Sequence, residues 1–258
     1  MASTSYIRSS PFAGDTRQPL NDEIRRALKE KGYKLEDGSP ILYVDELPEK
    51  VELRRCKYIT DVGDLEGVQE LNLSYCTSIT DVSALGCCEQ LQTLYLNYCT
   101  GVTNVSSLGG VQYLKLQGCT GITDVSALGR GAKHIDLSYC TGVTDVSSLG
   151  EVEYLDLSGC TGITDISPLG GGRVKELDLS YCTGITDVSA LCGIKTLNLN
   201  ECTGITDVSS LGGGGVKSLS LWGCPCVTDV SALRVQTLYL ERRCMGITAV
   251  STVHHDNR

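Results

Sequence analysis

Hydrophobic and polar positions follow one pattern that is written about ten times along the chain, and residues 176–191, ELDLSYCTGITDVSAL, show it most clearly. Leu177 and Leu179 alternate with polar residues, which is the period-two pattern of a short strand with one buried face. Aliphatic residues then recur at intervals of three, which predicts a tight arc or 3₁₀ turn rather than a long helix. A glycine-containing link leads to the next strand.

A cysteine marks each copy, three residues after the second leucine, and successive marker cysteines are 20 to 23 residues apart. A fixed period of this length is typical of solenoids, in which each copy stacks on the next and none folds alone. We therefore predict one elongated array with a small cap. The predicted structural ladder consists of Cys56, Cys76, Cys99, Cys119, Cys140, Cys160, Cys182, Cys202, Cys224 and Cys244.

The pattern VxxLxLxxCxxIT, as in residues 152–164, resembles the cysteine-containing class of leucine-rich repeats that is typical of F-box proteins. The next stretch, DISPL at residues 165–169, is similar to the short convex turn of bacterial internalins. The resemblance covers residues 51 to about 250. It implies an α/β leucine-rich-repeat solenoid that is mainly β by content. The expected curved parallel β-sheet lies on the concave side, with short turns or 3₁₀ segments on the convex side.

Three segments are expected along the chain. Residues 1–19 are rich in Ser, Thr, Pro and Gly, which predicts a flexible N-terminal tail. Residues 20–50 are predicted to form an N-terminal cap, with a helix from Asn21 to Gly32 and a hairpin between residues 33 and 44. Residues 51–258 form the array of about ten repeats. No dedicated C-terminal cap follows, which leaves end-to-end self-association through the C-terminal coil open.

The array carries most of the formal net charge of −9, because residues 51–258 hold 14 Lys and Arg against 22 Asp and Glu. This acidity argues against nucleic acid or an anionic membrane as a partner and favours a protein or peptide with a basic surface. The longest apolar runs are too short to span a membrane. The first residues also lack the apolar core of a secretory signal.

Ten of the 14 cysteines share one inward-facing position, where we expect free buried thiols. Neighbouring strands lie about 4.8 Å apart with parallel side chains, whereas a disulfide needs converging Cβ atoms about 3.8 Å apart. Free thiols predict the cytoplasm or another reducing intracellular compartment.

Two polar rows repeat with the cysteines. Each aspartate of the first row is expected to open a tight turn by accepting backbone N–H groups, with calcium binding as the alternative. The threonines of the second row are expected to make local hydrogen bonds, with ordering of water or binding of ice as the alternative. The aspartate row consists of Asp81, Asp124, Asp145, Asp165, Asp187, Asp207 and Asp229. The threonine row consists of Thr80, Thr103, Thr123, Thr144, Thr164, Thr186, Thr206, Thr228 and Thr248.

Outward positions of the strands vary from copy to copy, and they predict a binding surface on the concave face. An acidic patch of Asp136, Asp156, Glu176 and Asp178 is expected at mid-array, with aromatic rings around it. Carboxylates steer a cationic partner, and aromatic rings add contact area and cation–π attraction. The predicted partner-binding residues are Tyr95, Tyr113, Lys115, His134, Asp136, Tyr154, Asp156, Glu176, Asp178, Trp222 and Tyr239.

Chemistry-bearing residues are sparse. His134 is the one histidine among the repeats, and neither Cys87 and Cys88 nor Cys224 and Cys226 has a second ligand pair nearby in sequence. We therefore expect no catalytic site, no metal and no cofactor. The predicted function is a non-catalytic scaffold that binds a protein or peptide. Alternatives implied by the resemblance are the substrate-recognition subunit of a ubiquitin-ligase-type complex, although no F-box helices precede residue 51, and an internalin-like adhesin or effector.

Overall fold

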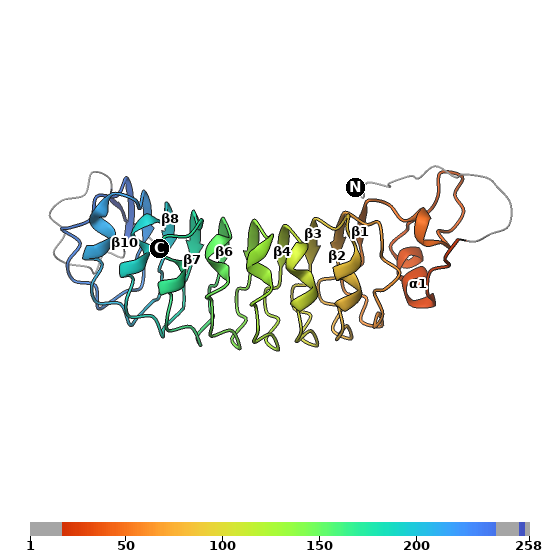
Figure 1. Ribbon diagram of the computed structural model, residues 1–258, viewed down its shortest axis with the longest axis horizontal. Coiled ribbons are helices and arrows are strands. Elements are labelled where there is room, and N and C mark those ends of the chain that lie inside the picture. The colour runs from red at the N-terminus through yellow and green to blue at the C-terminus, as the bar shows by residue number, and fades with distance from the viewer. Residues whose placement is uncertain (1–16, 241–252, 256–258) are drawn as a thin grey trace.

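The repeats stack into one gently curved row of coils, with the cap at one end (Figure 1). The computed structural model describes residues 17–240 and 253–255. Most of the predicted tail, Cys244 and most of the C-terminal coil expected to self-associate lie outside the described residues.

One strand from each coil joins a single parallel sheet in which every strand pairs with the next along the chain. The register is kept throughout, so that Leu155 pairs with Leu177 and Leu177 with Leu197. Length differences between repeats are therefore absorbed in the loops. The strands are β1 Lys50–Glu52, β2 Glu70–Asn72, β3 Thr93–Tyr95, β4 Tyr113–Lys115, β5 His134–Asp136, β6 Tyr154–Asp156, β7 Glu176–Asp178, β8 Thr196–Asn198, β9 Ser218–Ser220, β10 Thr237–Leu240 and β11 Val253–His255.

Short 3₁₀ helices lie on the side of the coils opposite the sheet, as the interval of three predicts. Each contains a buried leucine, such as Leu169, whose backbone N–H donates to Ile166. The convex 3₁₀ helices span Ser83–Cys87, Ser106–Gly110, Leu128–Arg130, Leu149–Glu151, Ser167–Leu169, Ser189–Gly193 and Ser209–Gly213. The predicted leucine-rich-repeat architecture is confirmed.

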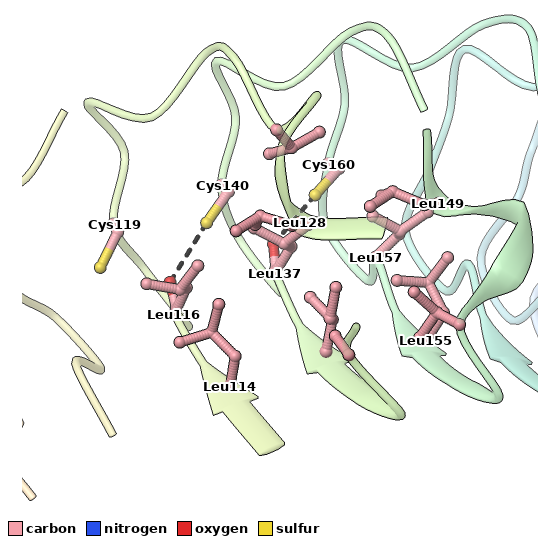
Figure 2. Packing of buried hydrophobic residues seen from close by; sticks show 14 of the residues in the cluster. Leu114, Leu116, Cys119, Leu128, Leu137, Cys140, Leu149, Leu155, Leu157 and Cys160 are labelled. Carbon is pink, nitrogen blue, oxygen red and sulfur yellow. Dashed lines mark hydrogen bonds between the residues drawn. The ribbon is translucent and has the colours of Figure 1, made fainter. Parts of the chain in front are cut away.

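Leucine, isoleucine, valine and cysteine side chains fill the inside of every coil and form one continuous core. Figure 2 shows the ladder cysteines above the leucines of the sheet. The Sγ atom of Cys160 donates to the carbonyl oxygen of Leu137 in the preceding coil at 3.1 Å, and Cys140 donates to Leu116 at 3.2 Å. Burial raises the pKa of both thiols to about 12. All ladder cysteines from Cys56 to Cys224 are free, as predicted.

The cap covers the first coil with helix α1, Asp22–Glu30, which follows Asn21 as expected. The Asn21 side chain accepts a hydrogen bond from the Ile24 N–H at 2.9 Å. Ile24 is fully buried in the core. On the side facing the array, the Tyr33 hydroxyl accepts from the Glu52 N–H at 2.8 Å. The cap therefore satisfies a backbone donor on the edge strand β1.

The predicted hairpin between residues 33 and 44 is wrong in its pairing. A turn does form, because the Leu35 N–H donates to the Ser39 carbonyl at 2.9 Å. Residues 41–44 nevertheless run antiparallel to residues 18–20, with the Leu20 N–H donating to Leu42 at 2.9 Å. Pro40 lacks a backbone N–H, which removes one donor that a hairpin ladder would use. Arg17 to Pro19, assigned to the tail by composition, thus contact the cap.

Candidate interaction surface on the concave face

Three aspartates lie side by side on the outward face of the sheet. Asp136 on β5 is the register partner of Asp156 on β6, which in turn is the register partner of Asp178 on β7. Neighbouring strands are about 4.8 Å apart, so the three carboxylates form a short line along the array. We call these three residues the acidic row.

One oxygen of each carboxylate has a structural role that the sequence analysis missed. The Oδ1 atom of Asp156 accepts a hydrogen bond from the Ser158 N–H at 2.9 Å, and Asp136 and Asp178 accept in the same way from residues two positions later. Asn72 makes the same turn with the Ser74 N–H at 3.0 Å. These Asx turns end the strands. The sequence signal was an Asp or Asn followed two residues later by Ser.

The second carboxylate oxygens differ along the row. The Oδ2 atom of Asp136 lies 3.4 Å from the Lys115 ammonium, and that of Asp178 accepts from the Asn198 amide at 2.8 Å. Within residues 17–240, the second oxygen of Asp156 has no hydrogen-bond partner. Burial raises the pKa of Asp156, and the charges of Asp136 and Asp178 raise it further, whereas its hydrogen bonds to Ser158 lower it. Among the described residues, none therefore supplies Asp156 with a countercharge.

Aromatic rings form a stack along one flank of the acidic row. The His134 ring lies 6.3 Å from the Tyr113 ring and 5.8 Å from the Tyr154 ring, between centroids. The Nε2 atom of His134 lies 2.7 Å from the Lys115 ammonium. Burial and the charge of Lys115 lower the pKa of His134, while Asp136 opposes the shift. A neutral imidazole that accepts from Lys115 fits this geometry.

A shallow concavity of about 430 Å³ opens on this surface. Its floor includes Leu155 and Leu177, and Glu176 projects from β7 beside Tyr154, its register partner. Six of the predicted site residues line this concavity: Lys115, His134, Tyr154, Asp156, Glu176 and Asp178. Asp136 lies beside them as the register partner of Asp156. Tyr113 lies beside them in the ring stack.

The remaining predicted residues lie away from this concavity. Tyr95 on β3 is the register partner of Lys115 and extends the surface toward the cap. Trp222 follows β9, and its backbone N–H donates to the side-chain oxygen of Asn200 at 2.8 Å. Tyr239 lies on β10, three strands beyond Asp178. Both are exposed, but they are not neighbours of the acidic row.

A second set of tyrosines, which sequence reasoning left unexplained, lies just before the cysteines. We call Tyr75, Tyr98, Tyr139 and Tyr181 the tyrosine row, and all four have left-handed backbone conformations with φ between 59° and 65°. The Tyr75 and Tyr98 rings stack with centroids 4.9 Å apart.

Glycines alternate with these tyrosines for a steric reason. A Cβ atom on Gly118 would lie 2.6 Å from the Tyr98 ring, and one on Gly159 would lie 2.7 Å from the Tyr139 ring. The Tyr98 and Tyr139 rings lean onto the following coil, so a side chain at the same position of that coil would have to move them. Glycine at this position in several copies could have indicated the left-handed backbone from the sequence, since glycine adopts positive φ readily.

The aspartate row on the convex side opens turns, as predicted. The Asp165 carboxylate accepts from the Ser167 N–H at 2.9 Å, and Asn104 replaces aspartate in the same role with Ser106. Hydrogen bonds from Ser167 lower the pKa of Asp165. In the part of the chain that the structure describes, no cluster of three or more His, Cys, Asp or Glu residues could hold a metal ion.

The prediction that the threonine row makes local hydrogen bonds is wrong for its described members. No hydroxyl from Thr80 to Thr228 bonds to a protein group in the described ranges. The methyl groups instead face the following coil: a Cβ on Gly121 would lie 2.9 Å from the Thr103 methyl carbon. Close approach of the coils therefore turns the methyl groups toward the backbone and leaves the hydroxyls to water.

Comparisons with known proteins agree with this architecture. A family model described as leucine-rich repeats in two copies matches residues 66–110, and a second leucine-rich-repeat model matches residues 174–192. No curated protein matches the chain. Among the described residues, no helix is long and apolar enough to cross a membrane.

The similar solved structures include internalins of Listeria monocytogenes. Internalin C2 is 20% identical with a TM-score of 0.54, covering 89% of this chain and 100% of that chain. Internalin InlF is 20% identical with a TM-score of 0.50, covering 91% and 88%. The functional domain of InlJ, described as including a cysteine ladder, is 16% identical with a TM-score of 0.39, covering 88% and 68%. The expected leucine-rich repeats with internalin-like turns are confirmed at the level of fold.

Proposed function

We propose that this leucine-rich-repeat solenoid is a non-catalytic scaffold whose concave face binds a protein or peptide with a basic surface. The observation that carries the proposal is the acidic row. Like charges directly opposite each other on adjacent strands destabilise a sheet, and here two such pairs share Asp156. Lys115 lies at one end of the row, against Asp136, and within residues 17–240 no cation is paired with Asp156. A cationic group from a partner would supply the missing countercharge.

The surroundings of the acidic row suit protein recognition. The ring stack of Tyr113, His134 and Tyr154 offers aromatic area beside the carboxylates, and exposed tyrosines are enriched at interfaces. Charge steers the encounter, while the rings provide most of the contact energy. The free ladder thiols further support placement of the protein in a reducing compartment.

The test is selection of random 12-residue peptides displayed on phage against the purified protein. We expect basic sequences to be enriched. Their affinity is then measured for two triple variants. The concave variant carries Asp136→Asn, Asp156→Asn and Asp178→Asn, and the convex control carries Asp145→Asn, Asp165→Asn and Asp187→Asn.

The two variants are closely matched. Both remove three negative charges from the same three coils, and both keep the side-chain oxygen that closes an Asx turn, as Asn72 and Asn104 do in the native chain. We expect the concave variant to lose at least about tenfold in affinity, since truncating one partner of a hydrogen-bonded charge pair costs 2–5 kcal/mol. The convex control should bind like the native protein. Equal affinities for both variants, or selection of no basic peptide, would refute the proposal.

A further inference from the structure

Tyr139 and Tyr181 occupy a position at which the fold imposes a left-handed conformation but does not require a tyrosine. Their φ angles are +59° and +63°, a region that costs a residue with a Cβ atom about 1–2 kcal/mol. Gly118, Gly159 and Gly223 adopt the same conformation at the equivalent position of other coils without that cost. Both tyrosines are also exposed, at 47% and 48% of their surface. Glycine satisfies the backbone at this position in other coils, and the tyrosines leave about half of each side chain open to a partner.

The tyrosine row runs beside the acidic row. Tyr139 follows Asp136 by three residues, and Tyr181 follows Asp178 by three, each just after the Asx turn. The two rows are also close enough to interact electrostatically. The pKa of Tyr98 is raised mainly by burial and by Tyr75, and to a smaller extent by Tyr139 and Asp136. In the ring stack, His134 and Tyr154 lie two residues before Asp136 and Asp156 on the same strands. The acidic row therefore has aromatic rings on both flanks.

The same row already binds a guanidinium group within the protein. Arg55 occupies the equivalent position one coil before Tyr75, and its guanidinium carbon lies 5.5 Å from the centre of the Tyr75 ring. In the described coils, no arginine or lysine lies over the rings of Tyr139 and Tyr181. The rings of Tyr139 and Tyr181 are therefore open to a guanidinium group from a partner, as the Tyr75 ring is to that of Arg55. They differ from Tyr75 in that the residue three positions earlier is an aspartate and not Asn72.

Arginine matches this surface better than lysine. Its planar guanidinium stacks on an aromatic ring and donates two parallel hydrogen bonds to a carboxylate, whereas the lysine ammonium is a compact, strongly hydrated charge. Two further arginine–tyrosine contacts place the guanidinium against the ring and beside a glutamate: Arg17 with Tyr43 at 3.9 Å, and Arg26 of the cap with Tyr58 of the first coil at 4.1 Å. The N-terminal end of the protein therefore already combines an arginine, a tyrosine and a carboxylate in this way.

We infer that Tyr139 and Tyr181, together with the acidic row, bind arginine side chains of an extended partner segment that runs along the array. This inference rests on the proposed function and specifies its ligand. Tyr139 and Tyr181 are two coils apart, about 9.6 Å at the spacing of parallel strands. A segment in the polyproline II conformation has three residues per turn and a rise of about 3.1 Å per residue, so arginines three positions apart lie on one side, about 9.3 Å apart, and would reach both rings.

The probe is the synthetic peptide Arg-Ala-Ala-Arg-Ala-Ala-Arg with blocked ends, and its control is the same peptide with lysine in place of arginine. Both carry the same charge, so the acidic row alone attracts them equally. We expect the native protein to bind the arginine peptide about fivefold more tightly, from stacking on the two rings. Affinities are measured by isothermal titration calorimetry at physiological ionic strength.

The variant that tests the rings is Tyr139→Gly with Tyr181→Gly, which installs the residue that other coils carry at this position. We expect it to lose the preference for arginine and to keep the affinity for the lysine peptide. The matched control is Tyr75→Gly, which removes a tyrosine with φ of +65° beside Asn72 and should leave both affinities unchanged. Thermal unfolding checks that the variants fold.

Three results would overturn the inference: equal affinity of the native protein for the two peptides, no binding of the arginine peptide, or unchanged arginine affinity in the double variant. None of these alone refutes the proposed function, because peptides selected from the random library would still distinguish the concave from the convex variant. If those two variants bind equally, the proposed function fails and this inference fails with it.

Discussion

Asp156 and Asp178 lie directly opposite each other on adjacent parallel strands, with their carboxylates on the same face of the sheet. In each residue one carboxylate oxygen accepts the hydrogen bond of an Asx turn. Within residues 17–240, only Asp178 of the two has a hydrogen-bond partner for its other oxygen. Because Asp136 stands on its other side, Asp156 is the residue at which negative charge is least compensated.

We expect Asp156→Asn to stabilise the protein at pH 7 by roughly 0.2–1 kcal/mol, the range for a like-charge pair on adjacent strands. The folded-state pKa of Asp156 is raised, so the folded state binds the proton more tightly than the unfolded state. The stabilisation that comes from protonating Asp156 is therefore fully present below the pKa of about 3.9 in the unfolded state, and it is lost as the pH rises through the pKa in the folded state. Asparagine keeps the turn without ionising.

The measurement is urea unfolding of the native protein and of Asp156→Asn at pH 7 and pH 3. The midpoint should be higher for the variant at pH 7, and the difference should shrink at pH 3. A variant that is less stable than the native protein at pH 7 would contradict the raised pKa.

The convex aspartates should respond to pH in the opposite direction. Hydrogen bonds from Ser167 lower the folded-state pKa of Asp165, so its contribution is present above the unfolded pKa and is lost as the pH falls through the folded pKa. Asp165→Ala should lower the melting temperature at pH 7 and have little effect at pH 2. Asp165→Asn should be milder, because Asn104 closes the same turn. The melting temperatures are measured by differential scanning fluorimetry from pH 2 to pH 7. If the difference between the native protein and Asp165→Ala is the same at both pH values, the ionised carboxylate does not stabilise the turn.

The ladder thiols should contribute to stability through their hydrogen bonds. Cys160→Ala would remove the thiol donor, while the Leu137 carbonyl still accepts from the Cys140 N–H at 3.0 Å, so the cost in the free energy of unfolding should be about 0.5–1.5 kcal/mol, the range for one lost hydrogen bond. Cys160→Ser should cost less, since the hydroxyl can donate to the same oxygen. Exposed Cys87→Ala serves as the control and should change little. Equal stability of the alanine and serine variants in urea would show that the donor is irrelevant.

Glycine and tyrosine in the tyrosine row should be energetically coupled. Gly159→Ala forces a Cβ atom into a φ of +71° and against the Tyr139 ring. Tyr139→Gly should remove the ring clash but not the backbone cost of about 1–2 kcal/mol. A double-mutant cycle measured by urea unfolding should therefore give a coupling of at least about 0.5 kcal/mol. Additive effects would place the ring away from Gly159.

The sequence predicted the repeating coil because the pattern itself carries the geometry: alternating leucines indicate strands, and intervals of three indicate the convex turns. It also placed the cysteines inward and free. It failed in the cap, where residues 41–44 pair with a segment about 24 positions earlier rather than with residues 33–35. Such pairing depends on tertiary contacts that no local pattern encodes.

The candidate site was predicted only in part. The register of the strands brings Asp136, Asp156 and Asp178 together, as alternation alone implies. The Asx turns of these residues and the tyrosine row depend on the local backbone at the ends of the strands. Positive φ at Tyr139 is hidden in sequence, because a tyrosine gives no sign of a left-handed conformation, and only glycine in sister copies hints at it.

The most direct test of the account is the pKa of Asp156, measured by NMR titration of the carboxyl carbon with and without the tightest peptide selected from the random library. If the concave face binds cationic groups at the acidic row, the pKa of Asp156 should fall on binding, while that of Asp165 on the convex side should stay constant. A pKa of Asp156 that is the same in the free and the bound protein would contradict the account.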